Sequence, residues 1–346
     1  MNVTFLIGNG FDLRLGLKTR YTDMYKGYIN SPTNDKVIAD FKEILRSDSI
    51  KNYQTWGDFE MAMARHAKNF KTEKDFISCV RDFKKYMSSY LKQEEQVLLN
   101  DLKNFPDIFT SFNNETYASL TKFYTNGLTP NVINQIKQIE RKSNAVYYRF
   151  INFNYTKTLD ALLEEYMKRH IHIQNPIHIH GDLKDAVLGV NDIFQLGELP
   201  YSVSLRLKRA FIKPEFNKMF DDSRVQDAIT LIEFSDVICT YGMSLGDSDA
   251  MWKDKIFEWL FGSENHHWFH FMYKEGNYSG LNGDELMDEE DDRKSELLSR
   301  FCKTDEEINR IYDQVHIPVG HDIFGYQKLW KQQKKVFDVE KVPAIV

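Results

Sequence analysis

The sequence predicts an α/β protein with a Rossmann-like, mostly parallel sheet flanked by helices and a large all-helical insertion after the first strand and helix. The chain opens with an apolar run at residues 3–7 that breaks into a glycine turn and a helical pattern. Comparable runs with polar ends recur at 145–154, 176–180 and 236–249. Between the first two runs, residues 35–144 have almost entirely helical patterns.

The opening glycine turn, Gly8-Asn9-Gly10, is a candidate phosphate or nucleotide site. Two glycines let the backbone turn and approach a ligand closely, and the N-terminus of the following helix favours negative charge. A complete dinucleotide fingerprint has a third glycine where Leu13 stands, and the next glycine here is Gly16. A turn that merely closes a strand–helix unit is therefore an open alternative.

The helical insertion is predicted from apolar residues at three- and four-residue steps. Residues 76–91 follow this spacing as one long helix, and shorter patterns of the same kind lie at 37–45, 58–70 and 132–139. The expected organisation is a Rossmann-like nucleotide-binding domain, residues 1–34 and 145–346, with a helical insertion subdomain at 35–144. Trp56 and Glu60 lie one helical turn apart, and a helix cap beside a core tryptophan is the favoured interpretation.

Composition narrows the class of protein. The chain has 346 residues, 42% hydrophobic and 28% charged, which is typical of a globular protein with a large core. A net charge of -6 argues against a broad nucleic-acid surface, although a nucleic-acid partner stays open. The N-terminus enters a strand directly and no run is long enough to cross a membrane, so cytoplasmic residence without a membrane partner is expected. Cys79, Cys239 and Cys302 are isolated, so we expect buried thiols and no metal.

Polar residues follow the second and third predicted strands. Asn154-Tyr155-Thr156 ends the second, at the edge where open α/β sheets bind ligands. In the third, alternation places His178 and His180 on one face, with Gly181 directly after them. A structural and a functional role for these histidines are equally open at this point.

The rest of the chain is predicted to complete the sheet. Residues 187–192 read as a short strand, 268–273 and 314–318 as further strands, and 282–296 as an acidic loop leading into a helix. Segments 201–220 and 224–234 read as helices. Their basic residues are interpreted as a solvated face, namely Arg206, Lys208, Arg209 and Lys213.

The run at 236–249 repeats the pattern of the opening turn. It carries Gly242 and Ser244, followed by Asp247 and Asp249 before a helix. The two aspartates are favoured as N-caps over ribose or metal ligands. Residues 320–322, Gly-His-Asp, are favoured as a helix start.

Motifs spread over nearly the whole chain resemble the bacteriophage abortive infection family AbiH. They are Leu6-Ile7-Gly8-Asn9-Gly10-Phe11-Asp12, Gly16-Leu17, Thr19-x-Tyr21, Trp56-x-x-x-Glu60, Asn152-Phe153-Asn154-Tyr155-Thr156, Ile179-His180-Gly181, Gly189-Val190-Asn191 and Tyr241-Gly242-x-Ser244. That family resembles, more distantly, the sirtuin-like NAD-binding proteins, whose glycine-rich turn, Asn-Tyr-Asp strand end and Leu-His-Gly turn build an NAD-consuming pocket. Thr156 replaces the acidic residue, and three isolated cysteines do not supply the four-cysteine zinc module of deacylases.

The resemblance implies a phage-defence toxin that hydrolyses NAD, its substrate, at the nicotinamide–ribose bond. Asn154 is the candidate that positions water, and His180 the candidate that accepts from a ribose hydroxyl. The remaining candidates are expected to bind the nucleotide: Gly8, Asn9, Gly10, Asp12, Thr19, Tyr155, Gly181, Asn191, Gly242 and Ser244.

Two alternatives from other classes stay open. A metal-dependent nuclease or phosphodiesterase toxin would use Asp12, Asp247 or Asp249 on a nucleic acid. A non-catalytic nucleotide sensor would bind its ligand unaltered and act through a partner. Expected partners are a nucleotide, with either a second copy of the chain or another protein of the defence system.

Overall fold

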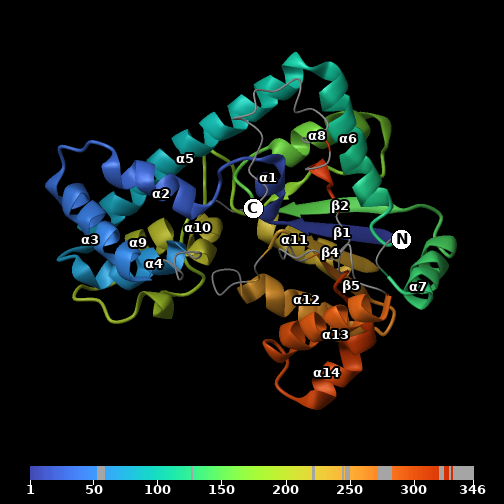
Figure 1. The fold of residues 1–346 in the computed structure, drawn as a ribbon. Coiled ribbons are helices and arrows are strands. Elements are labelled where there is room, and N and C mark those ends of the chain that lie inside the picture. The colour runs from blue at the N-terminus through green and yellow to red at the C-terminus, as the bar shows by residue number, and fades with distance from the viewer. Residues whose placement is uncertain are drawn as a thin grey trace.

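The structure is a computed structural model, and it describes residues 1–52, 59–125, 128–219, 223–243, 245, 250–271, 283–318, 323–326 and 329. A six-stranded parallel sheet forms its centre, in the order β3-β2-β1-β4-β5-β6 (Figure 1). The strands are β1 (Asn2–Ile7), β2 (Tyr147–Asn152), β3 (Ile177–His178), β4 (Val237–Tyr241), β5 (His267–Phe271) and β6 (Val315–His316). This is the order of the Rossmann fold, in which ligands bind where the strand order reverses, here between β1 and β4. The predicted fold class is confirmed.

The register aligns the carboxyl ends of the central strands. Ile7 of β1 pairs with Asn152 of β2 and with Tyr241 of β4. The chain therefore leaves these three strands at the same level, and the glycine turn, Asn154 and Gly242 follow at one edge of the sheet.

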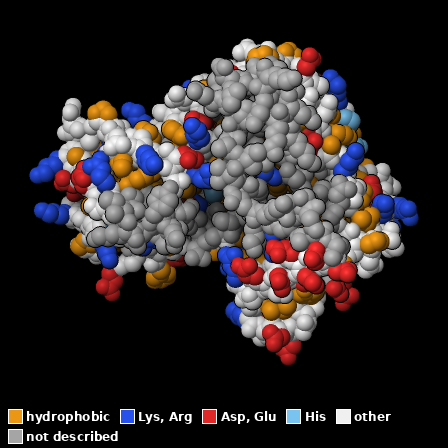
Figure 2. Space-filling view, in the orientation of Figure 1, with side chains coloured by type: hydrophobic (Ala, Val, Ile, Leu, Met, Phe, Trp, Pro, Cys, Tyr) orange, Lys and Arg blue, Asp and Glu red, His pale blue; other side chains and the backbone are white. Residues whose placement is uncertain are grey.

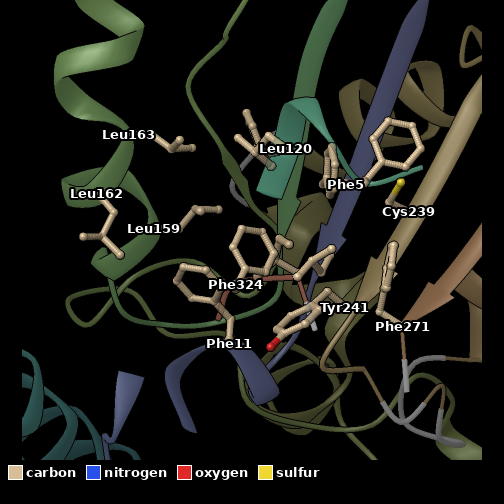
Figure 3. Close-up of a cluster of buried hydrophobic side chains, with 14 of the residues drawn as sticks. Phe5, Phe11, Leu120, Leu159, Leu162, Leu163, Cys239, Tyr241, Phe271 and Phe324 are labelled. Atoms are coloured by element: carbon tan, nitrogen blue, oxygen red, sulfur yellow. The ribbon is translucent and has the colours of Figure 1, made fainter. Parts of the chain in front are cut away.

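Alternation along the strands divides the core between the two faces of the sheet. Val3, Phe5 and Ile7 point into one cluster, whereas Leu6 points into another. The first cluster packs under α6 (Pro106–Thr121), α7 (Pro130–Arg141) and α8 (Thr158–Arg169). Figure 3 shows part of it, with Phe11 and Tyr241 close to Phe324; the ring centroids lie 5.1 Å and 4.8 Å from that of Phe324.

Helices α11 (Arg224–Glu233), α12 (Ala250–Gly262), α13 (Gly283–Ser299) and α14 (Asp305–Ile311) cover the second face. The acidic segment from residue 283 is helical throughout, so the predicted acidic loop at 282–296 is wrong for these residues. Acidic side chains gather over this part of the surface (Figure 2). A helix is the physical outcome because its acidic residues occupy the exposed face while Leu297 and Leu298 are buried.

The helical insertion contributes to two different cores. Helices α2 (Tyr21–Asn30), α3 (Lys36–Asn52) and α4 (Phe59–His66) form a lobe with α9 (Leu205–Phe211) and α10 (Lys213–Met219), on the left in Figure 1. The long helix α5 (Glu73–Asn104) begins in this lobe and ends beside the sheet, where Leu98 and Leu102 join the sheet core. The predicted boundaries at 34/35 and 144/145 stay a prediction.

Two predicted strands differ from the structure. Residues 187–192 form no strand of the sheet, and Val190 makes one isolated bridge to Ile212. Gly189 explains this irregular path, because its φ of +153° and its contact with the backbone of Phe211 suit no regular strand. The third strand ends at His178, so His180 lies in the following turn. Residues 320–322, which were expected to start a helix, lie outside the described residues.

Among the described residues, no helix has the length and apolar character needed to cross a membrane.

Candidate functional site

The carboxyl edge at β1 and β4 is closed by glycines packed backbone against backbone. The Gly8 N–H donates to the carbonyl of Tyr241 (2.8 Å), and the Gly10 N–H donates to that of Gly242 (3.0 Å). A Cβ on Gly10 would lie 2.4 Å from the Cα of Gly242, whose own φ of +66° is left-handed. The contact between two strand ends thus requires glycine at these positions independently of any ligand.

The phosphate role predicted for this turn depends on free backbone N–H groups. Those of Gly8 and Gly10 donate to the end of β4, and that of Phe11 donates to the Gly8 carbonyl (3.0 Å). Asn9 precedes the six-residue helix α1 (Gly10–Leu15) and is held by Thr19, whose Oγ1 donates to Asn9 Oδ1 (2.5 Å). The structure therefore brings together two of the predicted nucleotide-binding residues, Asn9 and Thr19. Their binding of phosphate stays a prediction.

Asp12 is a buried carboxylate that accepts from hydroxyl groups. Its oxygens accept hydrogen bonds from the side chains of Thr156 and Thr158, each at 2.6 Å, and its side chain is 1% exposed. Burial raises the pKa of Asp12 from 3.8 to about 6, against the lowering effect of the two hydrogen bonds. A second carboxylate at position 156 would meet Asp12 at hydrogen-bond distance, so threonine suits this arrangement where the sirtuin-like motif has an acid.

Asn154 lies beside the glycine turn. Its Nδ2 donates to the carbonyl of Gly8 (3.1 Å), and its backbone N–H donates to Asn152 Oδ1 (3.0 Å). These bonds fix the orientation of the amide. Within the described part of the chain, Asn154 Oδ1 accepts no hydrogen bond, and the predicted role of Asn154 in positioning water stays a prediction.

His180 belongs to a buried charged network with Lys213 and Glu60. Lys213 Nζ lies 2.9 Å from Glu60 Oε2 and 3.4 Å from His180 Nε2. The Lys213 and Glu60 side chains are only 7% and 5% exposed. The second oxygen of Glu60 accepts from the Gly189 N–H at 3.0 Å. A lysine ammonium donates to Nε2 only in the tautomer whose Nε2 carries no proton, and in that tautomer the ring proton lies on Nδ1.

Lys213 and Glu60 were not predicted as site residues, and the solvated-face interpretation of Lys213 is wrong. Helix α9 ends at Phe211, Ile212 bridges to Val190, and α10 begins at Lys213, which turns the lysine inward. Pro214 was the available signal, because the residue before a proline disfavours helical backbone and marks a break. Glu60 comes from the first turn of α4, where the helix dipole favours a carboxylate.

The aromatic side chains beside Asn154 pack on His180. The ring centroids of Phe153 and Tyr155 lie 5.6 Å and 5.9 Å from the His180 imidazole, and the Tyr155 hydroxyl donates to the Val187 carbonyl. Since these residues flank Asn154 in sequence, the two predicted catalytic residues occupy one region of the edge. Both are largely buried, with 5% and 8% exposed.

The other predicted residues have varied positions. Gly181 continues the His180 turn with φ +73°, where a Cβ would lie 2.6 Å from the Asp185 carbonyl. Asn191 lies at the start of the short helix η3 (Ile193–Leu196), with its N–H bound to Gln195. Trp56, Ser244, Asp247 and Asp249 lie outside the described residues.

His178 forms a separate pair at the end of β3. Its Nε2 lies 3.0 Å from Asp160 Oδ2, and its Nδ1 lies 3.3 Å from the Asn154 carbonyl. Burial acts to lower the pKa of His178, but the hydrogen bond and the charge of Asp160 raise it above its ordinary value. His178 therefore positions the backbone of Asn154. No group of three or more His, Cys, Asp or Glu residues in the described ranges is arranged to hold a metal ion.

The strand order and the polar edge define a Rossmann-like α/β protein whose strand order reverses between β1 and β4, the position at which proteins of this class bind ligands. The family description "Bacteriophage abortive infection AbiH" matches residues 4–272, which is most of the chain, and the protein belongs to this family. Its role is accordingly phage defence by abortive infection. The search of curated proteins found no match.

Proposed function

We propose that this AbiH protein acts in phage defence as an NAD glycohydrolase, cleaving NAD at the nicotinamide–ribose bond in the crevice between β1, β2 and the β3 turn. The observation that carries the proposal is the convergence of Asn154 and His180. Both lie at the carboxyl edge next to the reversal of strand order, with Phe153 and Tyr155 packed on the imidazole. The sirtuin-like resemblance of the three strand-end motifs supplies the choice of NAD.

The reaction needs a water and an acceptor close to the ribose. Asn154 Oδ1 accepts a hydrogen bond from the water, whose oxygen bonds to C1′ as the bond from C1′ to nicotinamide breaks. Nicotinamide leaves as a neutral molecule and the water releases a proton. The transition state resembles an oxocarbenium ion, and His180 stabilises it by accepting from a ribose hydroxyl, which takes the place of Lys213 Nζ at Nε2 when the substrate binds.

Lys213 and Glu60 serve as positioning residues in this proposal. Lys213 fixes the tautomer of His180, and Glu60 fixes Lys213. Because Glu60 belongs to α4, the helical insertion contributes to the site as well as to the core.

The test incubates the purified full-length protein with NAD and measures nicotinamide and ADP-ribose by chromatography. Asn154→Ala and His180→Ala are each expected to lower the rate by at least about 100-fold. His170→Ala is the matched control, because His170 is an exposed histidine at the end of α8. Circular dichroism and thermal unfolding confirm that each variant folds.

Parallel arms separate the alternatives. Unchanged NAD in cells in which the protein is toxic would overturn the proposal. Cleavage of tRNA or DNA that stops on addition of EDTA would favour the metal-dependent nuclease. Stabilisation by NAD in a thermal shift assay, with the nucleotide recovered intact from toxic cells, would favour the sensor.

A further inference from the structure

A cavity lies away from the glycine turn, between α11 and strands β2 and β3. Its volume is about 320 Å³, within the range of small-ligand sites. Eight residues line it: Arg149, Phe150, Gln174, Asn175, Ile177, Asp227, Thr230 and Leu231. Asp227, Thr230 and Leu231 are three and four positions apart, so one face of α11 forms a wall.

Arg149 gives this cavity its chemical character. It is the third residue of β2, and its Nη1 is buried without a hydrogen-bond partner. Among the described residues, its guanidinium makes only a cation–π contact, 5.4 Å from the centre of the Tyr147 ring. A buried N–H that lacks an acceptor destabilises the protein, so an acceptor supplied by a ligand would be favoured.

The carboxylate in the cavity wall does not serve as this acceptor. Asp227 accepts a hydrogen bond from the Ser223 hydroxyl at 2.8 Å, and in the described structure it forms no ion pair with Arg149. Its negative charge at the same cavity opposes a doubly charged phosphate more strongly than a singly charged ligand.

We propose that this cavity binds a small organic monocarboxylate. The planar guanidinium of Arg149 matches a carboxylate with two parallel hydrogen bonds. Gln174 and Asn175 also line the cavity and carry amide groups that can act as further donors, while Ile177 and Leu231 provide apolar surface for the rest of the ligand. This proposal does not depend on the proposed NAD hydrolysis, because its test measures the binding of a carboxylate and not the cleavage of NAD.

Isothermal titration with the full-length protein tests the proposal, using isovalerate as the probe. Isovaleramide has the same shape without charge, and inorganic phosphate tests for a general anion site. We expect isovalerate to bind with a Kd of about 1–10 mM, whereas the amide and phosphate bind at least about tenfold more weakly.

Variants assign the binding to the guanidinium. Arg149→Met is expected to weaken isovalerate binding at least about tenfold, and Arg149→Lys to give an intermediate Kd because it keeps the charge but loses the planar pair of donors. Arg141→Met is the matched control, since Arg141 is an exposed arginine of α7. No saturation below about 50 mM isovalerate, equal binding by Arg149→Lys and Arg149→Met, or tighter binding of phosphate would each overturn the proposal.

Discussion

The two sides of the carboxyl edge, the β1–β4 junction and the β3 turn, are built by different physical means. At the β1–β4 junction, Gly8, Gly10 and Gly242 bring two backbones together, and neutral hydrogen bonds hold the contact. At the β3 turn, His180 contacts Lys213, which pairs with Glu60, so an imidazole and an ion pair from three distant segments meet in a buried space.

The glycine junction is a scaffold, whereas the β3 turn is a site that holds reactive groups. The glycine junction leaves no room for side chains, and its N–H groups are largely used within the fold. The β3 turn instead holds a histidine beside an ammonium, where proton positions depend on the surroundings. We therefore expect substitutions at the junction to change stability, and substitutions at the β3 turn to change both stability and activity.

Removing Lys213 gives the largest expected effect. Lys213→Met leaves the Glu60 carboxylate buried without its counter-ion, which is expected to lower the free energy of unfolding by about 3–5 kcal/mol. Urea denaturation at neutral pH measures the loss. The double variant Glu60→Gln, Lys213→Met removes both charges and is expected to recover about 1–3 kcal/mol of it.

Lys218→Met is the matched control on the same helix. Lys218 pairs with Glu215 at 2.9 Å but is 72% exposed, so its loss is expected to change stability by less than about 1 kcal/mol. Equal losses for Lys213→Met and Lys218→Met would contradict the view that the β3 turn is held by a buried ion pair.

A pair of glycine substitutions tests the junction at two positions with the same φ. Gly242 and Gly197 both have φ +66°, but a Cβ on Gly242 would lie 2.6 Å from the Cα of Gly10, whereas one on Gly197 would have nothing within 4 Å. Gly197→Ala is expected to cost about 1–3 kcal/mol of unfolding free energy from backbone strain alone, because its ψ of -160° lies in a region that is essentially restricted to glycine. Gly242→Ala is expected to cost about 1–3 kcal/mol more, because neither backbone can move aside easily.

Urea denaturation of both variants gives this difference directly. Similar losses of unfolding free energy in the two variants would show that the two strand ends can separate at little cost. The junction would then be a flexible element of the carboxyl edge and not a scaffold.

The sequence predicted the parts of the fold that local patterns determine. β1, β2 and β4 are apolar runs next to glycine or asparagine turns, and the long helix α5 follows one apolar stripe, so each was predicted near its observed position. Strands β3 and β6 were also predicted, at 176–180 and 314–318, but each has only two residues in the structure. The segment around Gly189 was predicted as a strand, and its irregular path depends on tertiary contacts that no local pattern marks.

The same distinction applies to the site. Asn154 and His180 were predicted because they end apolar runs, and their convergence follows from the parallel register. Glu60 and Lys213 meet across 153 positions of the sequence, and nothing near either residue encodes the partner. A buried ion pair of this kind is formed by packing of α4 and α10, which a single sequence does not reveal.

Asp12 offers the most sensitive test of this comparison, because it is a buried acid on the β1–β4 side, where neutral hydrogen bonds hold the backbone contact. Its pKa of about 6 in the folded protein exceeds the ordinary value of 3.8, so the folded state binds this proton more tightly than the unfolded state. The contribution of Asp12 is therefore fully present below about pH 4 and is lost as the pH rises through 6, by roughly 2–3 kcal/mol. In Asp12→Asn this titration is absent, and the stability of the wild type relative to the variant is expected to fall between pH 4 and about pH 7.

Thr156→Val refines this measurement. It removes one of the two hydroxyl donors that favour the charged form of Asp12, so it is expected to raise the Asp12 pKa further and to cost about 1–2 kcal/mol more at pH 7 than at pH 4. Urea denaturation of the three proteins at pH 4, 5.5 and 7 provides the comparison. A constant difference between wild type and Asp12→Asn at all three values would mean that folding does not raise the Asp12 pKa. The β1–β4 side would then hold a buried charge at pH 5.5 as well as at pH 7, as the β3 turn does, and the contrast between the two sides below pH 6 would be lost.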